Sequence, residues 1–265
     1  MAIAHLSICH SIKRQFTSPC AVHWTATGDF VVYFHGAFVV ISFKLQDSPM
    51  FRPIQSPGRP VTLLGGGEAT GSLVNTALTF APLLVAADGG ARLARQGGHP
   101  LRAVVGDFDS LDAEDLGEAE RLHRPDQNST DFEKCLAAVE APLFLGVGFL
   151  GGRLDHQLAA FSALLKEPRP VVLLSKTEIA FLAPDPLTLD LEEGTPVALY
   201  PLLPAQLTTT GLRYPLDDAP VSPDGMTSTS NTALGGPLTV RVDRRSVLVM
   251  LPLAALGQVC AALAG

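Results

Sequence analysis

Two carboxylates, Asp107 and Asp109, are the residues of this chain best placed to do chemistry. They follow a short apolar run that ends in Gly106 and predicts a buried strand. At the end of a strand an Asp-x-Asp pair sends both side chains to the same side, because alternate residues share a face. Two such close carboxylates repel each other unless a cation lies between them, which points to a hard divalent ion such as Mg2+. Taken alone, the pair fits equally well a polar turn made by Asp107, Ser110 and Gly106.

The elements that position this pair alternate between short apolar strands and helices. Strands are expected at 61–64, 83–87, 103–105, 144–148 and 171–174, and helices at 72–80, 91–96, 113–122, from Thr130 onward, and up to about residue 165. This alternation indicates a mostly parallel sheet with helices on both faces, and such sheets bind ligands outside the carboxyl ends of their strands. The residues expected to meet at that edge are Asp88, Asp107, Asp109, Arg153 and Asp155. Their convergence favours a site for a metal and a phosphate group.

The stretch that begins at Thr130 and the glycine run 65–67 each have both a structural and a functional interpretation. Thr130 and Glu133 fit a capping box, which would place Asp131 in a first helical turn where the helix dipole favours negative charge. Capping accounts for one acid but not for the whole cluster. The glycine run 65–67 lets a backbone approach a ligand closely, or it makes a plain tight turn.

The pattern of the sequence changes after Pro186. Short alternating segments at 187–191, 196–200, 207–210, 238–242 and 247–251 predict a smaller antiparallel β domain, closed by a helix at 254–263. The polar run 227–231 has no hydrophobic periodicity. It is expected to be a loop, either simply solvated or reading the edge of a small polar ligand.

The predicted domains are an α/β domain at 58–183 and a β domain at 187–265. Residues 1–49 differ in character and contain an alternating apolar run at 30–43 that predicts a hairpin. Because Met50 stands just before the Pro-rich lead into the first clear strand, this extension is interpreted as a dispensable appendage or as the result of start-site choice. Its role is not readable from the sequence.

Composition restricts the class of protein. The chain has 265 residues, 47% of them hydrophobic and 17% charged, which is enough for a sizeable core. A net charge of -7 without a basic cluster argues against nucleic-acid binding, so an anionic ligand must be held locally. No membrane partner is expected, because the apolar run near the N-terminus is too short and interrupted to span a bilayer. The cysteines Cys9, Cys20, Cys135 and Cys260 lack zinc-ligand or CxxC spacing, which predicts reduced thiols and a cytoplasmic location.

Six stretches resemble the thiamine pyrophosphokinase family, whose members transfer pyrophosphate from ATP to thiamine. They are Ala87-Asp-Gly-Gly-Ala91, Gly106-Asp-Phe-Asp-Ser110, Asp126-Gln-Asn-Ser-Thr-Asp-Phe-Glu-Lys134, Gly151-Gly-Arg-Leu-Asp-His156, Thr210-Gly-Leu-Arg-Tyr-Pro-Leu216 and Ser228-Thr-Ser-Asn231, in the order of the family. The resemblance covers nearly all of the chain from Val61 to Leu251.

The resemblance implies an α/β domain for ATP and Mg2+, a C-terminal β-sandwich for thiamine, and a homodimer. Each active site would lie between the α/β domain of one subunit and the β domain of the other. The residues implied at the Mg-ATP site are Asp88, Asp107, Asp109 and Asp131, with Arg153, Asp155, Gly89 and Gly90 beside them, and the implied metal ligands are Asp107, Asp109 and Asp131. The residues implied near thiamine are Gln127, Asp131, Tyr214, Ser228, Ser230 and Asn231, with Tyr214 stacking on the pyrimidine ring.

Departures from the family pattern leave the preferred nucleoside triphosphate open. Asn128 replaces a common Asp, Arg92 a usual Asn, and Leu101-Arg102 a frequent Pro-Asp. Tyr214 also fits a core position of the β domain, and His156 fits a local hydrogen-bonding role as well as catalysis.

Two other functions use the same residues. One is a Mg2+-dependent phosphohydrolase with water as the nucleophile. The other is a non-catalytic protein that binds a nucleotide or thiamine.

Overall fold

The computed structural model describes residues 21–24, 30–34, 37–41, 53–109 and 111–263. The chain divides into two compact units, Met1–Pro53 and Ile54–Gly265. In the first unit, strands β1 (Ala21–Trp24), β2 (Phe30–Phe34) and β3 (Ala37–Ile41) form an antiparallel sheet in that order. The predicted hairpin therefore corresponds to the antiparallel pair β2–β3, while residues 1–20, 25–29, 35–36 and 42–49 lie outside the described residues.

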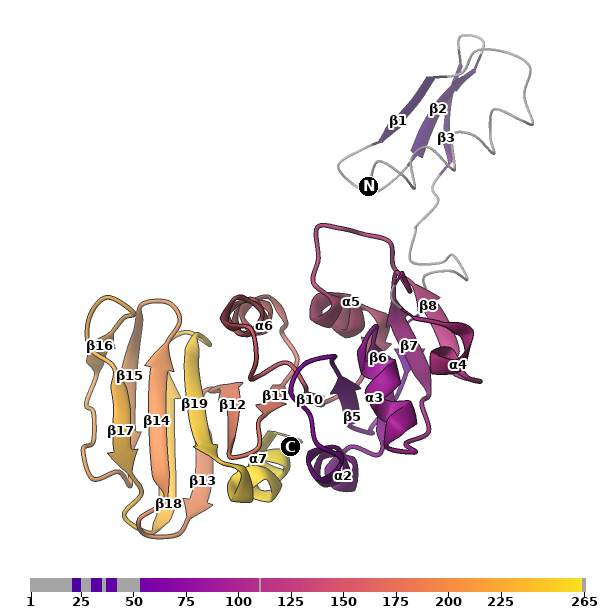
Figure 1. Ribbon diagram of the computed structural model, residues 1–265. Coiled ribbons are helices and arrows are strands. Elements are labelled where there is room, and N and C mark those ends of the chain that lie inside the picture. Colours follow the sequence, from indigo (N-terminus) through magenta and orange to yellow (C-terminus); the bar gives the residue numbers. More distant parts are fainter. Residues whose placement is uncertain (1–20, 25–29, 35–36, 42–52, 110, 264–265) are drawn as a thin grey trace. The chain divides into compact units, whose positions relative to one another are not determined.

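The second unit is built on a central sheet whose first half is parallel (Figure 1). Its strands are β5 (Val61–Leu64), β6 (Leu83–Ala87), β7 (Ala103–Gly106), β8 (Glu120–His123), β10 (Phe144–Val147) and β11 (Val171–Leu174), in the order β11-β10-β5-β6-β7-β8. Every residue of β5, β7, β10 and β11 is buried, as expected of parallel strands covered on both faces. A short parallel pair, β4 (Ile54–Gln55) with β9 (Val139–Glu140), lies outside this sheet.

Helices cover both faces of the parallel strands. They are α2 (Gly71–Phe80), α3 (Gly90–Gln96), α4 (Ala113–Leu116), α5 (Asp131–Ala138) and α6 (Leu154–Lys166). Residues of α2, α3 and the C-terminal helix α7 (Leu256–Leu263) pack into one buried cluster, and residues of α5 and α6 pack into another. The buried strands lie between these two clusters.

The predicted helix at 113–122 is wrong in its second half. Helix α4 ends at Leu116, Gly117 follows with a φ of +52°, and residues Glu120–His123 form β8. A left-handed glycine commonly ends a helix. Strand β8 is an edge strand that buries only Leu122, so its sequence has no strong alternation, and its structure depends on pairing with β7.

The sheet continues with antiparallel strands beyond β11. These are β12 (Glu178–Leu182), β19 (Val247–Pro252), β14 (Pro196–Pro201) and β17 (Ser228–Thr232), in the order β12-β19-β14-β17. A second sheet contains β13 (Leu187–Leu191), β18 (Gly236–Val242), β15 (Ala205–Thr210) and β16 (Ala219–Val221). Inward residues of both sheets, such as Leu189, Val240 and Val249, share one buried cluster, so the C-terminal half is a β-sandwich followed by the 3-10 turn η3 (Leu253–Ala255) and α7. The predicted fold class is confirmed.

Two findings refine the sequence interpretation. The run 227–231, expected to be a loop, forms most of the edge strand β17 and pairs with β14. An edge strand that exposes one face has no need of a hydrophobic pattern, which explains why the run did not read as a strand. One sheet also runs through both predicted domains, whose ranges 58–183 and 187–265 stay predictions.

Substitution of Gly90 tests the close packing of α3 against β5. A Cβ built at Gly90 would lie 2.0 Å from the Leu64 carbonyl oxygen, whereas one built at Gly71 would meet nothing within 4 Å. We expect Gly90→Ala to lower the free energy of unfolding by roughly 1–3 kcal/mol, because backbone atoms must shift to accept the methyl group. Urea unfolding measures the change, and Gly71→Ala is the matched control. Equal stability of the two variants would contradict this packing.

Candidate active site

The carboxyl ends of four neighbouring parallel strands gather the predicted residues at one edge. Strands β10, β5, β6 and β7 pair in parallel and in register, so the segments that follow them leave the sheet on the same side. Gly65 follows β5, Asp88 follows β6 and Asp107 follows β7. This is the edge at which open parallel sheets bind their ligands.

The glycines at this edge pack backbone against backbone. The Gly67 N–H donates to the Gly148 carbonyl at 3.1 Å, and a Cβ at Gly67 would lie 2.5 Å from that oxygen. A Cβ at Gly66 would lie 3.4 Å from Gly89. Close packing against Gly148 therefore explains Gly67, whereas a Cβ at Gly66 would make an ordinary contact. Gly66 and Gly67 are exposed, so their backbone is also accessible to a ligand.

Asp88 lies against the end of β7. A Cβ built at Gly106 would be 3.1 Å from the Asp88 Oδ1, which puts this carboxylate beside the residue that precedes Asp107. Asp88 and Phe108 have positive φ values of 34° and 64°. Such backbone conformations cost energy in non-glycine residues and are concentrated at functional sites.

Asp107 is the centre of the hydrogen bonds at this edge. The Asp109 N–H donates to its Oδ1 at 3.4 Å, and the Gln127 Nε2 donates to its Oδ2 at 3.4 Å. Two predicted partners, Asp109 and Gln127, thus lie beside Asp107. The groups available here to bind a metal ion are carboxylate oxygens, which are ligands that suit Mg2+.

A buried cation that the sequence interpretation missed connects Asp107 with Asp131. The Lys134 side chain is 6% exposed, and its Nζ lies 3.1 Å from Asp131 Oδ1 and 4.0 Å from Asp107 Oδ2. Helix α5, which carries both Asp131 and Lys134, packs on β6 and β7. This pair could have been found from the sequence, because residues three apart in a helix lie on the same face.

The capping box at the start of α5 is confirmed. The Glu133 N–H donates to Thr130 Oγ1 at 3.2 Å, and the Thr130 N–H donates to Glu133 Oε2 at 3.0 Å. Burial raises the pKa of Glu133, but hydrogen bonds from Lys166 and Thr130 outweigh it and hold the pKa below its usual value. The cap fixes where the helix begins and so positions Asp131.

A second residue missed from the sequence is Arg124, which directly follows β8. Its backbone N–H donates to the Gly106 carbonyl at 2.7 Å, beside the start of the Asp107 segment. Burial lowers the pKa of its guanidinium. The guanidinium donates from Nη1 to the His123 carbonyl at 3.2 Å.

Arg153 and Asp155 lie on the same edge but apart from Asp107. Arg153 donates to Asp155 from Nε at 3.1 Å and from Nη2 at 2.6 Å, and both side chains are exposed. The hydrogen bond from Arg153 lowers the pKa of Asp155. Strands β5 and β6 separate β10 from β7, a span of about 14 Å at the usual strand spacing.

The three predicted metal ligands are not drawn together into a closed cage. Within the part of the chain that the structure describes, no three His, Cys, Asp or Glu side chains lie close enough to hold a metal ion. Mg2+ usually takes one or two carboxylates and completes its shell with waters and substrate phosphates. The Asp107–Asp109 pair fits this kind of site, and the full ligand set stays a prediction.

Two of the residues predicted near thiamine, Tyr214 and Ser228, contact the buried amide of a third, Asn231. Asn231, 4% exposed, accepts from the Tyr214 N–H at 3.1 Å and donates to the Tyr214 carbonyl at 2.7 Å and to Ser228 Oγ at 3.2 Å. Its side chain therefore holds the Tyr214 segment against β17. Tyr214 is 63% exposed, so the alternative that it belongs to the core is wrong. Ser230 is exposed on the same strand.

The two groups of predicted residues lie far apart in one chain. Strand β17 is at one end of the ten-stranded sheet and β7 is next to the other end, with seven strands between them. At the usual spacing this is about 38 Å along the sheet. One chain therefore does not bring Tyr214 to Asp107.

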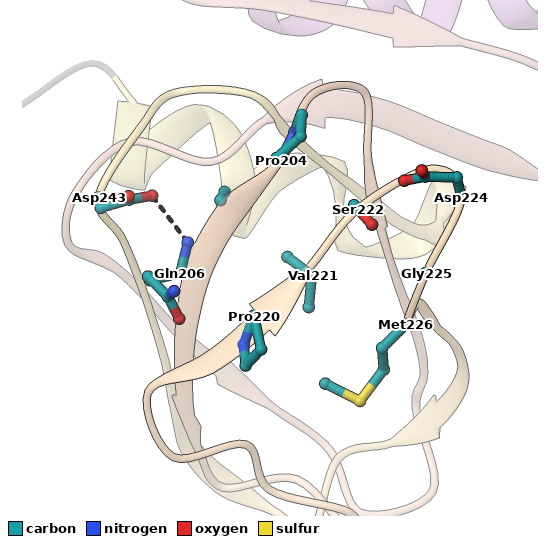
Figure 2. Close-up of a pocket in the computed structure, with 10 residues that line it drawn as sticks. Pro204, Gln206, Pro220, Val221, Ser222, Asp224, Gly225, Met226 and Asp243 are labelled. Atoms are coloured by element: carbon teal, nitrogen blue, oxygen red, sulfur yellow. Dashed lines mark hydrogen bonds between the residues drawn. The ribbon is translucent and has the colours of Figure 1, made fainter.

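A separate cavity opens in the β-sandwich (Figure 2). It has a volume of about 460 Å3 and is lined by residues of β15, β16, the following turn and Asp243, whose Oδ1 accepts from the Gln206 N–H at 2.9 Å. None of the predicted site residues lines it.

The fold and its acidic edge define a class of α/β enzyme with an attached β-sandwich, and comparisons with known proteins identify the family. Residues 74–173 match the family model for the thiamin pyrophosphokinase catalytic domain, and residues 186–247 match that for the thiamin pyrophosphokinase vitamin B1 binding domain. The chain is 32% identical over 215 residues to Thiamine pyrophosphokinase 1 of Oryza sativa subsp. japonica, covering 64% of this chain and 81% of that protein.

Solved structures share the fold of this chain. A protein from Lactobacillus plantarum is 28% identical, with a TM-score of 0.60 over 73% of this chain and 98% of its own. Yeast thiamin pyrophosphokinase, 17% identical, shares the fold with a TM-score of 0.61 over 80% of this chain and 91% of its own.

The chain belongs to the thiamin pyrophosphokinase family. The predictions of family and of thiamine diphosphokinase activity are thereby confirmed, as are those of an ATP-using catalytic domain and a thiamine-binding domain. Among the described residues, none of the helices has the length and apolar character needed to cross a membrane.

Substitution of Asn231 tests whether this residue supports the structure of the site rather than contacting a ligand. We expect Asn231→Ala to lower the free energy of unfolding by roughly 1–3 kcal/mol, because it leaves buried backbone groups of the Tyr214 segment without their partner. Ser230→Ala, on the exposed face of the same strand, is the control and should change stability little. Urea denaturation compares them, and an Asn231→Ala protein as stable as the control would refute the supporting role.

Proposed function

We propose that this chain carries out its thiamine pyrophosphokinase reaction at the Asp107 edge of the sheet. The hydroxyethyl oxygen of thiamine attacks the β-phosphorus of ATP, the bond from that phosphorus to the α-phosphate oxygen breaks, and AMP leaves. Transfers of this type depend on positioning and charge neutralisation more than on a covalent nucleophile. The observation that carries the proposal is that both domain matches occur in one chain whose carboxylates lie at the ligand-binding edge of the sheet.

Mg2+ is proposed as the metal that accompanies ATP. Asp107 and Asp109 would hold it, with Asp131 as the third predicted ligand and Asp88 beside them. When bound, a divalent ion of this kind neutralises charge on the phosphate oxygens. Arg124 and Arg153 are the cations that we assign to the polyphosphate, because guanidinium groups offer forked donors to phosphate oxygens. Gly89 and Gly90 would bring backbone close to the nucleotide.

Asp131 and Asp155 are the two proposed acceptors of the thiamine hydroxyl proton. Each is paired with a cation: Asp131 with the buried Lys134, and Asp155 with both Nε and Nη2 of Arg153. Gln127 would help to orient thiamine at the same edge. His156 has no role in this proposal.

The thiamine side of the site is proposed to come from the second subunit of a homodimer. Tyr214 would stack on the pyrimidine, and Ser228 and Ser230 would hydrogen-bond it, while Asn231 holds their segment. The distance between β17 and β7 within one chain supports a site shared between two chains. An apolar surface that a partner subunit can cover is present on α6, where Leu154 is 68% and Leu158 is 59% exposed, one turn apart. We also retain the prediction of a cytoplasmic location.

The acids can be tested directly with ATP, Mg2+ and thiamine. We expect Asp107→Asn and Asp109→Asn each to lower AMP formation at least about 100-fold, because the polyphosphate charge is no longer neutralised, with an unchanged circular dichroism spectrum. Chromatography of AMP and thiamine diphosphate measures both products. Near-normal turnover by both variants would refute the metal assignment. ATP breakdown that does not need thiamine would favour the phosphohydrolase, and binding without AMP release would favour a binding protein.

Mixing two inactive variants tests whether the site is shared. Asp107→Asn damages the ATP side and Tyr214→Ala the thiamine side. In a randomly exchanged one-to-one mixture, half of the dimers are mixed and each has one intact site, so we expect about a quarter of the wild-type activity. Sites contained within single chains would give no more activity than the two variants measured separately.

A charge placed on α6 tests the proposed interface. Leu158→Glu is expected to shift the protein from dimer to monomer in sedimentation, because a carboxylate would have to be buried between subunits. Leu203→Glu, at an exposed leucine between β14 and β15, is the matched control and should remain dimeric. Two variants with the same sedimentation behaviour as the wild type would place the interface elsewhere.

A further inference from the structure

Lys134 belongs to the acidic edge but has no role in the proposed chemistry. It lies on α5, one turn after Asp131, and its side chain is buried. A lysine ammonium is strongly hydrated, so burying it is costly unless acids compensate its charge. Its Nζ lies within 4.0 Å of carboxylate oxygens of both Asp107 and Asp131. The geometry is that of an internal counter-ion between two acids that belong to different elements.

The position of this ammonium matters for metal binding. Without a cation, the carboxylates of Asp107 and Asp131 would repel each other or would have to be held by a bound metal ion. With Lys134 in place, one positive charge is already present before any metal or nucleotide arrives. The net negative charge of the edge is then smaller, so it attracts a free divalent ion less strongly. A metal ion that arrives bound to ATP has additional ligands from the phosphates.

We propose that Lys134 is a positioning residue that neutralises and spaces Asp107 and Asp131, so that the site takes its divalent ion together with the nucleotide rather than as a free ion. This inference rests on the proposed function only in that Asp107 and Asp109 receive the ion. It adds a role for a residue that neither touches the reacting atoms nor binds the metal.

Free Mn2+ without nucleotide is the probe, because its binding can be followed by electron paramagnetic resonance with no enzymatic turnover. We expect Lys134→Met to bind free Mn2+ on the order of tenfold more tightly than the wild type, because an uncompensated acid pair attracts the ion. Lys134→Arg, which keeps the charge, should bind like the wild type. Lys166→Met is the matched control, since Lys166 is exposed and pairs with Glu133 on the outside of α5.

The thermal midpoint gives a second readout. In chelator, Lys134→Met should melt below the wild type because of repulsion between the acids, and Mn2+ should restore much of the loss. If Lys134 only fills the core, Mn2+ would not restore the midpoint and the Mn2+ affinity would not rise, and either result would overturn the proposal.

A double variant keeps the test decisive if Lys134→Met does not fold. Asp131→Asn with Lys134→Met should bind Mn2+ more tightly than Asp131→Asn alone, because loss of the ammonium leaves more negative charge at Asp107 and Asp109. An affinity that stays at the Asp131→Asn value would overturn the proposal, because the charge of Lys134 would then have no effect on the ion. Mn2+ binding is measured without thiamine or ATP, so these results stand apart from whether the pyrophosphokinase assay succeeds.

Discussion

Repulsion between carboxylates is the constraint on which the acidic edge of this protein depends. The parallel strands deliver Asp88 and Asp107 to one side of the sheet, and α5 brings Asp131 to the same place. Like charges at such distances destabilise a fold unless something compensates them. The buried Lys134 does so between Asp107 and Asp131, while the backbone N–H of Asp109 and the amide of Gln127 donate to Asp107. An ion pair and hydrogen bonds therefore hold these side chains in place at the edge of the sheet.

The same edge shows how a packing requirement and a binding function use the same residues. Gly67 and Gly90 are glycines because neighbouring backbone leaves no room for a Cβ. The capping box of Thr130 and Glu133 is explained by helix stability alone, yet it also sets the position of Asp131 and Lys134. Structural and functional interpretations of these residues are therefore compatible.

The continuous ten-stranded sheet gives the chain its second constraint. Because β17 and β7 lie near opposite ends of this sheet, seven strands separate the residues assigned to the pyrimidine of thiamine from those assigned to ATP. No loop closure within one chain removes such a separation. The proposed pairing of two chains would bring the two half-sites together, and the exposed leucines of α6 are the proposed apolar surface for it.

The amino-acid sequence by itself determined the buried parallel strands, the capping box and the family, because continuous apolar runs, cap residues and motif spacing are local features. Strands Val61–Leu64, Leu83–Ala87 and Val171–Leu174 have the predicted bounds. Only the tertiary structure decided that residues 120–123 and 228–232 are strands, since edge strands take their conformation from a pairing partner. It alone placed Lys134 between two acids and turned the Asn231 amide inward, because the partner of a buried polar group is set by packing between segments distant in the chain.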